Sequence, residues 1–322
     1  MTAVLVTGAA GFIGSHLAEA LIDRGDRVIG IDNFDPFYPR AIKERNLTRL
    51  KGAAGFTFHE ADILDGDALR ALLAPGMVVV HLAAKAGVRP SLAAPDAYVE
   101  ANLLGTASVI ESARAAGVSR LVFGSSSSVY GDDTPAPFRE DAPAVRPVSP
   151  YAATKRGAEL LLDSVAPHFG LRVAAVRLFT VYGPRQRPDL AIHHFARRIA
   201  ARQPITLFGD GTQARDYTYS SDIVAGLLRA FAWTDRAPVG MEIFNLGGAR
   251  AVPLLEMVSS LAQALEIDPV IEWAPMQPGD VRNTAADLTK SERMLGYQPA
   301  VSFEEGIRRF VAWFREHHDD EP

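Results

Sequence analysis

A glycine-rich turn near the N-terminus places the strongest constraint on the fold. An apolar stretch typical of a buried strand runs into a helix-like stretch through the sequence TGAAGFIG (Thr7–Gly14). Gly8 permits a tight turn, Gly11 lets backbone amides approach a pyrophosphate, and Gly14 lets the helix pack closely on the sheet. A phosphate then lies at the helix N-terminus, where unpaired N–H groups and the helix dipole favour an anion. The motif therefore predicts a dinucleotide-binding unit, and a turn that only packs is the alternative.

Two acids follow later strands and bear on the identity of the dinucleotide. Asp32 stands at the end of the second predicted strand, 18 residues after Gly14. A carboxylate there binds a ribose 2′-hydroxyl and repels a 2′-phosphate, which predicts NAD over NADP; a solvated turn residue is the alternative. Asp62 follows the third strand and either meets the adenine or caps a helix, since Asp62 and Asp65 both precede a helical stretch.

The first half of the chain alternates apolar strand-like runs with helix-like stretches. Strands are expected at Ala3–Thr7, Arg27–Ile31, Phe56–His59, Met77–His81, Arg120–Gly124 and Arg172–Leu178. Helices are expected near Phe12–Asp23, Leu69–Leu73, Ala97–Ala115 and Ser149–His168. Continuous apolar strands separated by helices indicate a parallel sheet that is covered on both faces. The fold class predicted is therefore α/β, with a doubly wound (Rossmann) parallel sheet.

After about Gly183 prolines interrupt this rhythm, and the elements become shorter. Helices are expected near Leu190–Ala201, Asp222–Trp233, Leu254–Leu265, Thr289–Leu295 and Phe303–Glu316, with a buried strand at Glu242–Leu246. We expect residues 1–180 to form the NAD-binding domain and residues 222–248 to return to it. The remaining segments of 181–322 would form a smaller C-terminal α/β substrate-binding region.

Composition excludes several classes of function. Of the 322 residues 48% are hydrophobic and 22% are charged, the balance of a globular protein with a core. A net charge of −5 gives no basic surface for nucleic acid, and the absence of cysteine excludes disulfides and thiolate chemistry. No apolar run is long enough to span a bilayer, and the first strand does not resemble a signal peptide. We expect a cytoplasmic protein that binds no nucleic acid, no membrane and, since no histidines have ligand spacing, no metal.

A tyrosine and a lysine in the sequence YAATK are candidates for proton transfer. Tyr151 and Lys155 stand at positions i and i+4, on one face of a helix. The pKa of a free tyrosine is about 10, and a nearby ammonium together with a positive nicotinamide ring would pull it toward neutrality. Tyr151 could then act as general base and later as acid. A surface Tyr–Lys pair is the alternative.

The position of this pair supports the catalytic interpretation. It opens the helix after the fifth strand, and that strand ends in GSSSSVYG (Gly124–Gly131). The carboxyl ends of the strands of a doubly wound sheet face the ligand crevice, so the Ser126 hydroxyl can bind the reacting oxygen. A turn or a helix cap is the alternative role for these serines.

Together these motifs resemble the extended short-chain dehydrogenase/reductase superfamily. The residues that carry the resemblance are TGAAGFIG, Asp32, His81-Leu82-Ala83-Ala84, Asn102, SSSSVYG and YAATK. Further stretches resemble UDP-glucuronate 4-epimerases and related UDP-sugar 4-epimerases of the NAD-dependent epimerase/dehydratase family. These stretches are Asn33–Leu47, Ala83–Leu92, Arg177–Ala191, Pro204–Tyr219 and Gln277–Val281. The resemblance extends to about Leu295.

The resemblance implies a role for each matching position. Tyr151 would be the base, Lys155 its partner, and Ser126 the hydroxyl beside the substrate O4. Thr180 would line the sugar site, Phe208 would lie on the uracil, and Arg215 would grip the diphosphate. Arg185 and Arg187 would be weaker anion candidates or solvated loop charges. A tightly bound NAD would be held by Gly8, Gly11, Phe12, Ile13, Gly14, Asp32, Asn33, Asp62, Ile63, Leu82, Ala83, Ala84, Asn102, Tyr151 and Lys155.

The implied reaction is a 4-epimerisation of a UDP-sugar through a 4-keto intermediate. The hydride taken from C4 is given back to the other face, so NAD is regenerated in each turnover. The implied partners are the UDP-sugar and a second copy of the chain, because the helices at Ala97–Ala115 and Ser149–His168 would pair across a two-fold axis. Packing of these two helices within one chain is the alternative to a homodimer.

The residues at the sugar site bear on the choice of sugar. With a carboxylate at C6 the 4-keto intermediate is a β-keto acid that loses CO₂ readily. Ser127, Ser128 and Thr180 are neutral hydroxyls that could hold that carboxylate where the alignment for its loss is poor, and Arg89 is either a further holder or a surface arginine. Related dehydratases carry an Asp-Glu pair at the position of Ser127-Ser128, and related decarboxylases carry a Glu at the position of Ser128.

The sequence therefore favours a UDP-glucuronate 4-epimerase. A 4-epimerase of a neutral UDP-sugar (UDP-glucose or UDP-N-acetylglucosamine) is the nearest alternative, because hydroxyls also bind hydroxyls. Another nucleotide-sugar oxidoreductase or decarboxylase of the same fold is a further alternative. A non-catalytic NAD-binding protein is disfavoured because Tyr151, Lys155 and Ser126 are all present.

Overall fold

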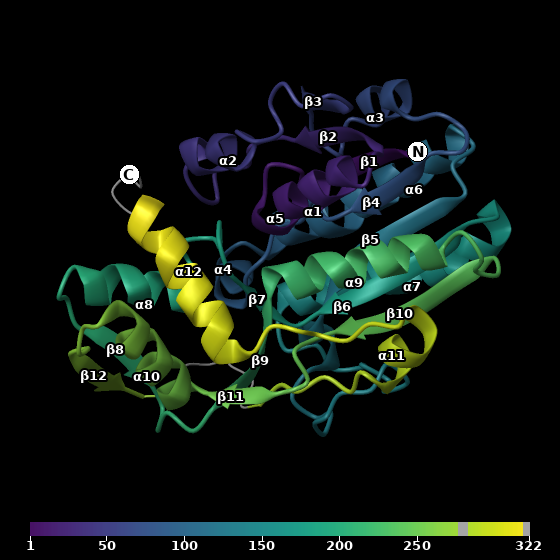
Figure 1. Ribbon diagram of the computed structural model, residues 1–322. Coiled ribbons are helices and arrows are strands. Elements are labelled where there is room, and N and C mark those ends of the chain that lie inside the picture. Colours follow the sequence, from purple (N-terminus) through teal and green to yellow (C-terminus); the bar gives the residue numbers. More distant parts are fainter. Residues whose placement is uncertain (276–282, 318–322) are drawn as a thin grey trace.

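The main sheet sets the position of everything else in the molecule. The computed structural model describes residues 1–275 and 283–317, and within them seven parallel strands pair in the order β10-β6-β5-β4-β1-β2-β3 (Figure 1). Their bounds are β1 (Ala3–Thr7), β2 (Arg27–Asp32), β3 (Phe56–Glu60), β4 (Val78–His81), β5 (Arg120–Ser126), β6 (Arg172–Leu178) and β10 (Gly240–Leu246). The chain winds outward from β1 in both directions, so the order reverses between β1 and β4. A ligand crevice forms at such a reversal, outside the carboxyl ends of the strands.

Helices cover both faces of this sheet, which confirms the predicted doubly wound α/β fold. One face packs against α1 (Phe12–Asp23) and α9 (Ser220–Trp233). The opposite face packs against α3 (Gly66–Leu72), α6 (Gly105–Ala115) and α7 (Pro150–Phe169). Figure 1 shows α9 lying along one face of the sheet, across β5 and β6.

The two faces are built from alternate residues of the same strands. In β1 the side chains of Val4 and Val6 join the core under α1 and α9, while Leu5 joins the core on the other face. This follows from the two-residue period of a strand. Because both faces are buried, the strand reads as a continuous apolar run in the sequence.

The last strand of the sheet comes from far along the chain. The strand that we expected at Glu242–Leu246 is β10, and it pairs in parallel with β6, with Phe244 opposite Val176. The helix α9 connects back to it, so residues from beyond Gly183 complete the main sheet.

A smaller region with its own core adjoins the main sheet. A three-stranded sheet and a two-stranded sheet carry it, with three larger helices around them. The elements are β7 (Thr180–Tyr182), β9 (Ala214–Tyr219), β11 (Ala251–Pro253), β8 (Ile205–Phe208), β12 (Ile271–Ala274), α8 (Ala191–Ala200), α10 (Leu254–Leu265) and α12 (Phe303–His317). Side chains such as Leu207, Met257 and Phe310 form a cluster separate from the two cores of the main sheet.

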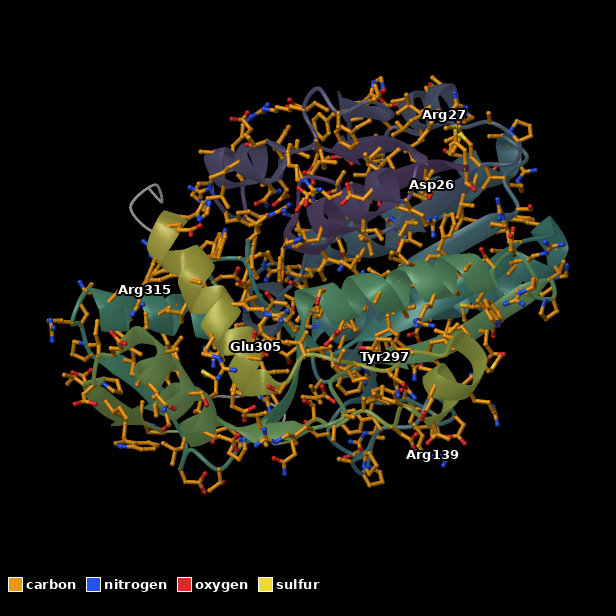
Figure 2. The ribbon with its side chains drawn as sticks, in the orientation of Figure 1. Asp26, Arg27, Arg139, Tyr297, Glu305 and Arg315 are labelled. Atoms are coloured by element: carbon orange, nitrogen blue, oxygen red, sulfur yellow. The ribbon has the colours of Figure 1, made fainter. Side chains whose placement is uncertain are left out.

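The helix α12 closes this smaller region. Figure 2 shows Glu305 near the start of α12 and Arg315 near its end. The Arg315 guanidinium donates to the carbonyl oxygens of Ala264 and Leu265, at 3.3 and 3.1 Å, and so ties α12 to the end of α10. The family-like segment Gln277–Val281 lies outside the described residues.

Short helices connect the larger elements, and all of them except the helix expected at Thr289–Leu295 differ from expectation. They are α2 (Arg40–Asn46), α4 (Val88–Ala93), α5 (Pro95–Tyr98), the π-helix η1 (Val99–Leu104), the 3-10 helix η2 (Ser127–Tyr130) and α11 (Thr289–Leu295). The single helix that we expected over Ala97–Ala115 is therefore α5, η1 and α6 in succession. Within residues 1–275 and 283–317, no helix has both the length and the apolar character that crossing a bilayer requires.

Candidate active site

A cavity of about 580 Å³ opens at the carboxyl edge of the main sheet. This volume is within the range of roughly 300–1,000 Å³ that is common for small-molecule sites. The structure brings most of the predicted site residues together on its wall. These are Gly8, Gly11, Phe12, Ile13, Gly14, Asp32, Asn33, Asp62, Ile63, Leu82, Ala83, Ala84, Ser126, Ser127, Ser128, Tyr151, Lys155, Thr180 and Arg187.

The glycine turn forms one end of this cavity. Gly8 has a φ of +72°, in the left-handed region that favours glycine. A Cβ at Gly14 would lie 2.0 Å from the carbonyl oxygen of Gly8, so only glycine allows α1 to begin this close to the turn. The N-cap of α1 is Gly11, which has no side chain to bond the first amides of the helix, and such amides suit an anion.

Asp32 ends β2 beside this turn. Its carboxylate accepts hydrogen bonds from the backbone N–H of Ala10 (3.2 Å) and of Phe34 (2.9 Å). The Nζ atom of Lys43 lies 3.6 Å from the same carboxylate, and both side chains are buried. Lys43 also lines the cavity, and we did not predict it from the sequence. It belongs to α2, a short helix that the sequence pattern did not indicate.

The structure separates the two roles that were open for Asp62. The cap of α3 is Asp65, whose carboxylate accepts from the N–H of Ala68 at 3.0 Å. Asp62 instead accepts from the N–H of Leu64 (2.9 Å) and from the Asn33 amide (2.8 Å). Asp62 and Asn33 therefore form one polar unit on the cavity wall.

Tyr151 and Lys155 lie in the first two turns of α7. The Ser149 hydroxyl caps this helix by accepting from the N–H of Ala152 (3.2 Å), and Pro150 occupies the first helical position. This start places Tyr151 beside the carboxyl end of β5. Its ring meets that of Tyr98 edge-on, with centroids 6.3 Å apart.

The surroundings of the Tyr151 hydroxyl push its pKa in opposite directions. Burial raises the pKa of Tyr151 above its ordinary value, while a hydrogen bond with Ser126 and the charge of Arg187 lower it. The cation that acts on this phenol in the structure is thus Arg187, a residue that we considered as an anion ligand or a solvated loop charge. A bound positive ring would act in the same direction as Arg187.

Lys155 is almost fully buried behind Tyr151. Its ammonium donates to the carbonyl oxygen of Gly124 at 2.7 Å and lies 5.0 Å from the centre of the Phe123 ring. Burial lowers the pKa of Lys155 to about 8, and the negative charge of Glu159 opposes this shift. The side chain is therefore partly deprotonated in mildly alkaline solution.

Ser126 both caps a helix and takes part in the site, so the two interpretations that were open for the serines hold together. Ser126 ends β5 in an extended conformation, and its hydroxyl accepts from the N–H of Ser128 at 3.2 Å, which caps η2. The same hydroxyl bonds to Tyr151. Ser127 and Ser128 follow on the cavity wall, and Thr180, at the start of β7, lies on that wall too.

Arg187 is held in a fixed orientation on the cavity wall. Its Nε and Nη2 atoms donate to the two oxygens of Asp189, at 2.9 and 2.8 Å. Its guanidinium lies 5.2 Å from the centre of the Phe37 ring. Of the two interpretations open for this residue, a site charge rather than a solvated loop charge agrees with the structure.

A second charged pair on the wall was not predicted. The Lys85 ammonium lies 2.6 Å from the Asp35 carboxylate, and both residues line the cavity. Asn102 holds the backbone of Lys85 in place. Its side-chain oxygen accepts from the Lys85 N–H (2.8 Å), and its side-chain nitrogen donates to the Lys85 carbonyl oxygen (2.9 Å). Asn102 itself is buried and does not line the cavity, so the structure places it under the site that we expected it to line.

Three predicted substrate residues lie away from the cavity wall. Arg89 on α4 places its guanidinium 5.1 Å from the centre of the Phe208 ring at the end of β8. Arg215 lies on β9 and donates to the carbonyl oxygen of Ala214 (3.2 Å). Arg89 and Phe208, which we assigned to opposite ends of the substrate, are therefore in contact with each other. Among the described residues we find no group of three side chains able to hold a metal ion.

Known proteins resemble this chain over nearly its whole length. The sequence profile of the NAD dependent epimerase/dehydratase family matches residues 4–247. A UDP-glucuronate 4-epimerase from Thermodesulfobacterium geofontis is 41% identical over 315 residues, which cover 97% of this chain and 96% of that protein.

Two solved structures have the same fold. A UDP-glucuronic acid 4-epimerase from Bacillus cereus, in complex with UDP-glucuronic acid and NAD, superposes with a TM-score of 0.91 at 35% identity, covering 98% of this chain and 99% of that one. A UDP-glucose 4-epimerase from Thermotoga maritima, with UDP-glucose, gives a TM-score of 0.89 at 32% identity, covering 98% of this chain and 100% of that one.

Proposed function

The chain belongs to the NAD dependent epimerase/dehydratase family, and we propose that it is a UDP-glucuronate 4-epimerase, an isomerase that interconverts UDP-glucuronate and UDP-galacturonate. The observation that carries this proposal is the group formed by Tyr151, Ser126 and Lys155 at the carboxyl edge of the sheet. A phenol that can give and take a proton there faces the same cavity as the glycine turn.

The residues present fit NAD as the cofactor. The close approach of Gly14 to Gly8 leaves a cradle that a Cβ would fill, and the amides at the start of α1 suit a pyrophosphate. Asp32 suits a ribose diol and disfavours a 2′-phosphate. When bound, NAD supplies an acceptor for the C4 hydride and gives it back. We propose that the fifteen residues assigned to NAD above hold it, with Asn102 acting through the backbone of Lys85.

The protein's own groups then manage protons and charge. Tyr151 takes the proton of the sugar O4 and returns it after epimerisation. Ser126 bonds to the phenol and can bond to O4 as well, since one hydroxyl both donates and accepts. The charge of Arg187 and the burial of Lys155 set the protonation states that this exchange requires.

We propose a uronic acid as the substrate on the chemistry of the neighbouring wall. Ser127, Ser128 and Thr180 offer neutral hydroxyls to both oxygens of a C6 carboxylate. Arg187 adds a positive charge on the same wall. No carboxylic acid stands at positions 127 or 128 to serve a dehydration or a decarboxylation.

The remaining substrate residues belong to the UDP portion in this proposal. We assign Phe208 and Arg215 to the uracil and the diphosphate, and Arg89 to the substrate through its contact with Phe208. We also propose the division into an NAD-binding domain of residues 1–180 with 222–248, and a UDP-sugar-binding domain of the remaining segments. The separate core of the smaller region supports this division.

We further propose that the protein is a homodimer that pairs through η1, α6 and α7. These elements pack side by side, and two of them carry exposed apolar side chains: Val99 and Leu104 on η1, and Leu160 on α7. Exposed apolar side chains on neighbouring helices are typical of a subunit interface. The cytoplasmic location stays a prediction.

Incubation of the purified protein with UDP-glucuronate and no added NAD tests the function. We expect UDP-galacturonate to accumulate, because the cofactor is regenerated in place. UDP-xylose or a 4-keto pentose as the product would contradict the assignment of Ser127, Ser128 and Thr180. Turnover of UDP-glucose alone would contradict the uronic acid and leave an epimerase of a neutral sugar.

Two tyrosines at the same place give a matched control. Tyr151→Phe should lower kcat by roughly 10²–10⁴-fold, the usual loss of a general acid–base group. Tyr98→Phe alters the neighbouring ring, whose hydroxyl donates to the carbonyl oxygen of Ala86 (2.9 Å), and should keep most of the activity. Equal losses in both variants would contradict the role of Tyr151.

A further inference from the structure

We propose that Glu159 is a positioning residue of the catalytic site, which acts from beneath it on the charge of Lys155 and on the carboxyl end of β5. The inference rests on the proposed function, because it concerns the same tyrosine and lysine. Glu159 stands four residues after Lys155 on α7, one helical turn deeper in the molecule. Its side chain has an exposed fraction of 0%.

The Glu159 carboxylate accepts four hydrogen bonds, two on each oxygen. Oε1 accepts from the Ser125 hydroxyl (2.6 Å) and from Nε of Arg177 (2.9 Å). Oε2 accepts from Nη2 of Arg177 (2.8 Å) and from Nη1 of Arg156 (2.9 Å). Burial alone would raise the pKa of Glu159, but these bonds outweigh it and hold the pKa below its usual value. The buried group is therefore a carboxylate, with a fixed negative charge.

The hydrogen bond from Ser125 to Glu159 fixes the carboxyl end of β5, which carries the site residues. Ser125 stands between Gly124, whose carbonyl oxygen accepts from Lys155 at 2.7 Å, and Ser126, whose hydroxyl bonds to Tyr151. The bond from Ser125 to Glu159 therefore holds both contacts in place at once. An error of about 1 Å at such a point costs roughly 10²-fold in rate.

The charge of the carboxylate acts on the lysine directly. Burial lowers the pKa of Lys155, and Glu159 opposes this shift. The His81 ring on β4 also lies near Lys155, but burial lowers the pKa of His81 to about 3, so it carries no charge at neutral pH. Among the described residues, Glu159 and His81 are the ionisable groups that interact electrostatically with Lys155. Arg156 and Arg177 bond to the Glu159 carboxylate, and Arg187 acts on Tyr151.

If Glu159 had a purely structural role, that role would explain its ion pair with Arg177. It would not explain why the Glu159 carboxylate lies directly beneath Ser125 and Lys155. Arg177 lies on β6, stacks over the Tyr130 ring at 4.6 Å and pairs with Glu159 in two parallel bonds. Such a pair contributes little net stability after both charges are desolvated. The two interpretations differ in what the loss of the Glu159 carboxylate does to the pKa of Lys155 and to the pH dependence of kcat.

Nuclear magnetic resonance of labelled lysine side chains measures that quantity. The chain contains five lysines, and Lys155→Met identifies the signal of Lys155. We expect Lys155 to titrate near pH 8 in the native protein. Glu159→Gln keeps the shape and an acceptor for Ser125 but removes the charge, so the ammonium becomes less favourable. Its titration, and the alkaline limb of kcat against pH, should move down by roughly half to one pH unit.

A matched variant on the same carboxylate controls for the lost hydrogen bond. Arg156 is the partner on the solvent side, with a side chain that is 22% exposed. Arg156→Met removes a bond to Glu159 and a positive charge, so the titration of Lys155 should stay or move slightly up. A downward shift in Arg156→Met equal to that in Glu159→Gln would overturn the inference.

Ser125→Ala tests the positional part separately. It removes the 2.6 Å bond to Glu159 and leaves the charge. We expect kcat to fall roughly three- to tenfold, because the strand end that carries Ser126 is held less firmly against Tyr151. KM should not change, and the titration of Lys155 should stay close to the native one because the charge of Glu159 remains. An unchanged kcat would overturn this part.

A double variant covers the case in which Glu159→Gln does not fold. If Glu159→Gln does not fold because Arg177 is left buried without a partner, the double variant Glu159→Gln/Arg177→Met removes both charges and should fold. It should also lower the pH at which Lys155 titrates. An unmoved titration in the folded variant overturns the inference. Failure of the native protein to convert UDP-glucuronate would instead overturn the proposed function, and the titration of Lys155 would remain measurable.

Discussion

At the scale of single residues, the absence of a side chain matters as much as its presence. A Cβ at Gly14 would lie 2.0 Å from the backbone oxygen of Gly8, so Gly14→Ala must push α1 away from the turn. We expect the affinity of the variant for NAD to fall more than about tenfold, since lost pyrophosphate contacts cost more than about 1.4 kcal/mol, and we expect the purified variant to carry less NAD than the native protein. Absorbance of the cofactor released by denaturation measures this content.

Gly157→Ala is the control for that substitution. Gly157 also lies inside a helix, but a Cβ there would meet its nearest neighbour, Leu103, at 3.4 Å, an ordinary contact. This variant should keep its NAD and gain about 0.5–1 kcal/mol in helix stability. Full retention of NAD in Gly14→Ala would contradict the account of the turn.

Residues in motifs at strand ends could be predicted, and residues whose contacts depend on loop paths could not. Asp32, Ser126 and Tyr151 line the cavity as expected because the sheet itself brings strand ends together. Lys43 reaches Asp32 only through the course of the segment after β2, which carries no periodic signal. The contact between Arg89 and Phe208 likewise depends on how α4 meets the smaller region.

At the scale of elements, the segment between β7 and α8 (183–190) joins the two halves of the site. It carries Arg187 on the cavity wall. Three contacts tie it to α1: the His16 ring meets the carbonyl oxygen of Pro184 (2.9 Å), and Arg185 donates to Glu19 (2.7 Å) and to the Ser15 hydroxyl (3.2 Å). The other arginine that we considered as an anion ligand, Arg185, is therefore an anchor between elements.

Removal of this anchor should loosen the segment without unfolding the protein. We expect Arg185→Ala to lower kcat/KM for UDP-glucuronate roughly tenfold, because Arg187 loses its fixed place beside Tyr151. Steady-state kinetics measure the effect. Arg49 also pairs with Glu19: its side chain is 62% exposed, and its Nη1 atom lies 3.3 Å from the Glu19 carboxylate. Arg49→Ala should therefore change kcat/KM less than twofold. A loss in Arg49→Ala as large as in Arg185→Ala would refute the anchor.

Elements with a clear apolar pattern could be predicted from the sequence, and the shortest strands of the smaller region could not. The expected strand Arg172–Leu178 is β6 with the same bounds, because seven successive residues establish the pattern. β7 and β11 have three residues each and β8 and β12 have four, too few to show a period. The helix expected over Ala97–Ala115 contains the π-helix η1, whose Asn102 bonds to Lys85 and Thr154 instead of simply facing solvent or core.

At the scale of the whole molecule, the return of β10 to the main sheet could be suspected but not established from the sequence. The apolar run at Glu242–Leu246 indicates a buried strand, but its pairing with β6 joins segments more than sixty residues apart. Pairing over such a separation depends on tertiary packing, which no local pattern reports. The structure supplies this information directly.

The proposed subunit interface gives a prediction at the same scale. Leu104 and Leu160 are 55% and 53% exposed on neighbouring elements. The double variant Leu104→Glu/Leu160→Glu should be a monomer, because charges on an apolar interface are left without partners. Light scattering after size-exclusion chromatography measures the mass. Val239→Glu, at a residue 50% exposed elsewhere on the molecule, should stay dimeric. A monomeric native protein would contradict the proposal.

The central claim is that the hydrogen at C4 of the sugar leaves and returns within a single cavity. UDP-glucuronate deuterated at C4 tests it most directly, by mass spectrometry and nuclear magnetic resonance of the product in ordinary water. We predict UDP-galacturonate with the deuterium still at C4, because a hydride held between the sugar and a bound cofactor does not exchange with solvent. A product that has lost its deuterium to water would show that C4 inverts through proton abstraction, and would contradict the account.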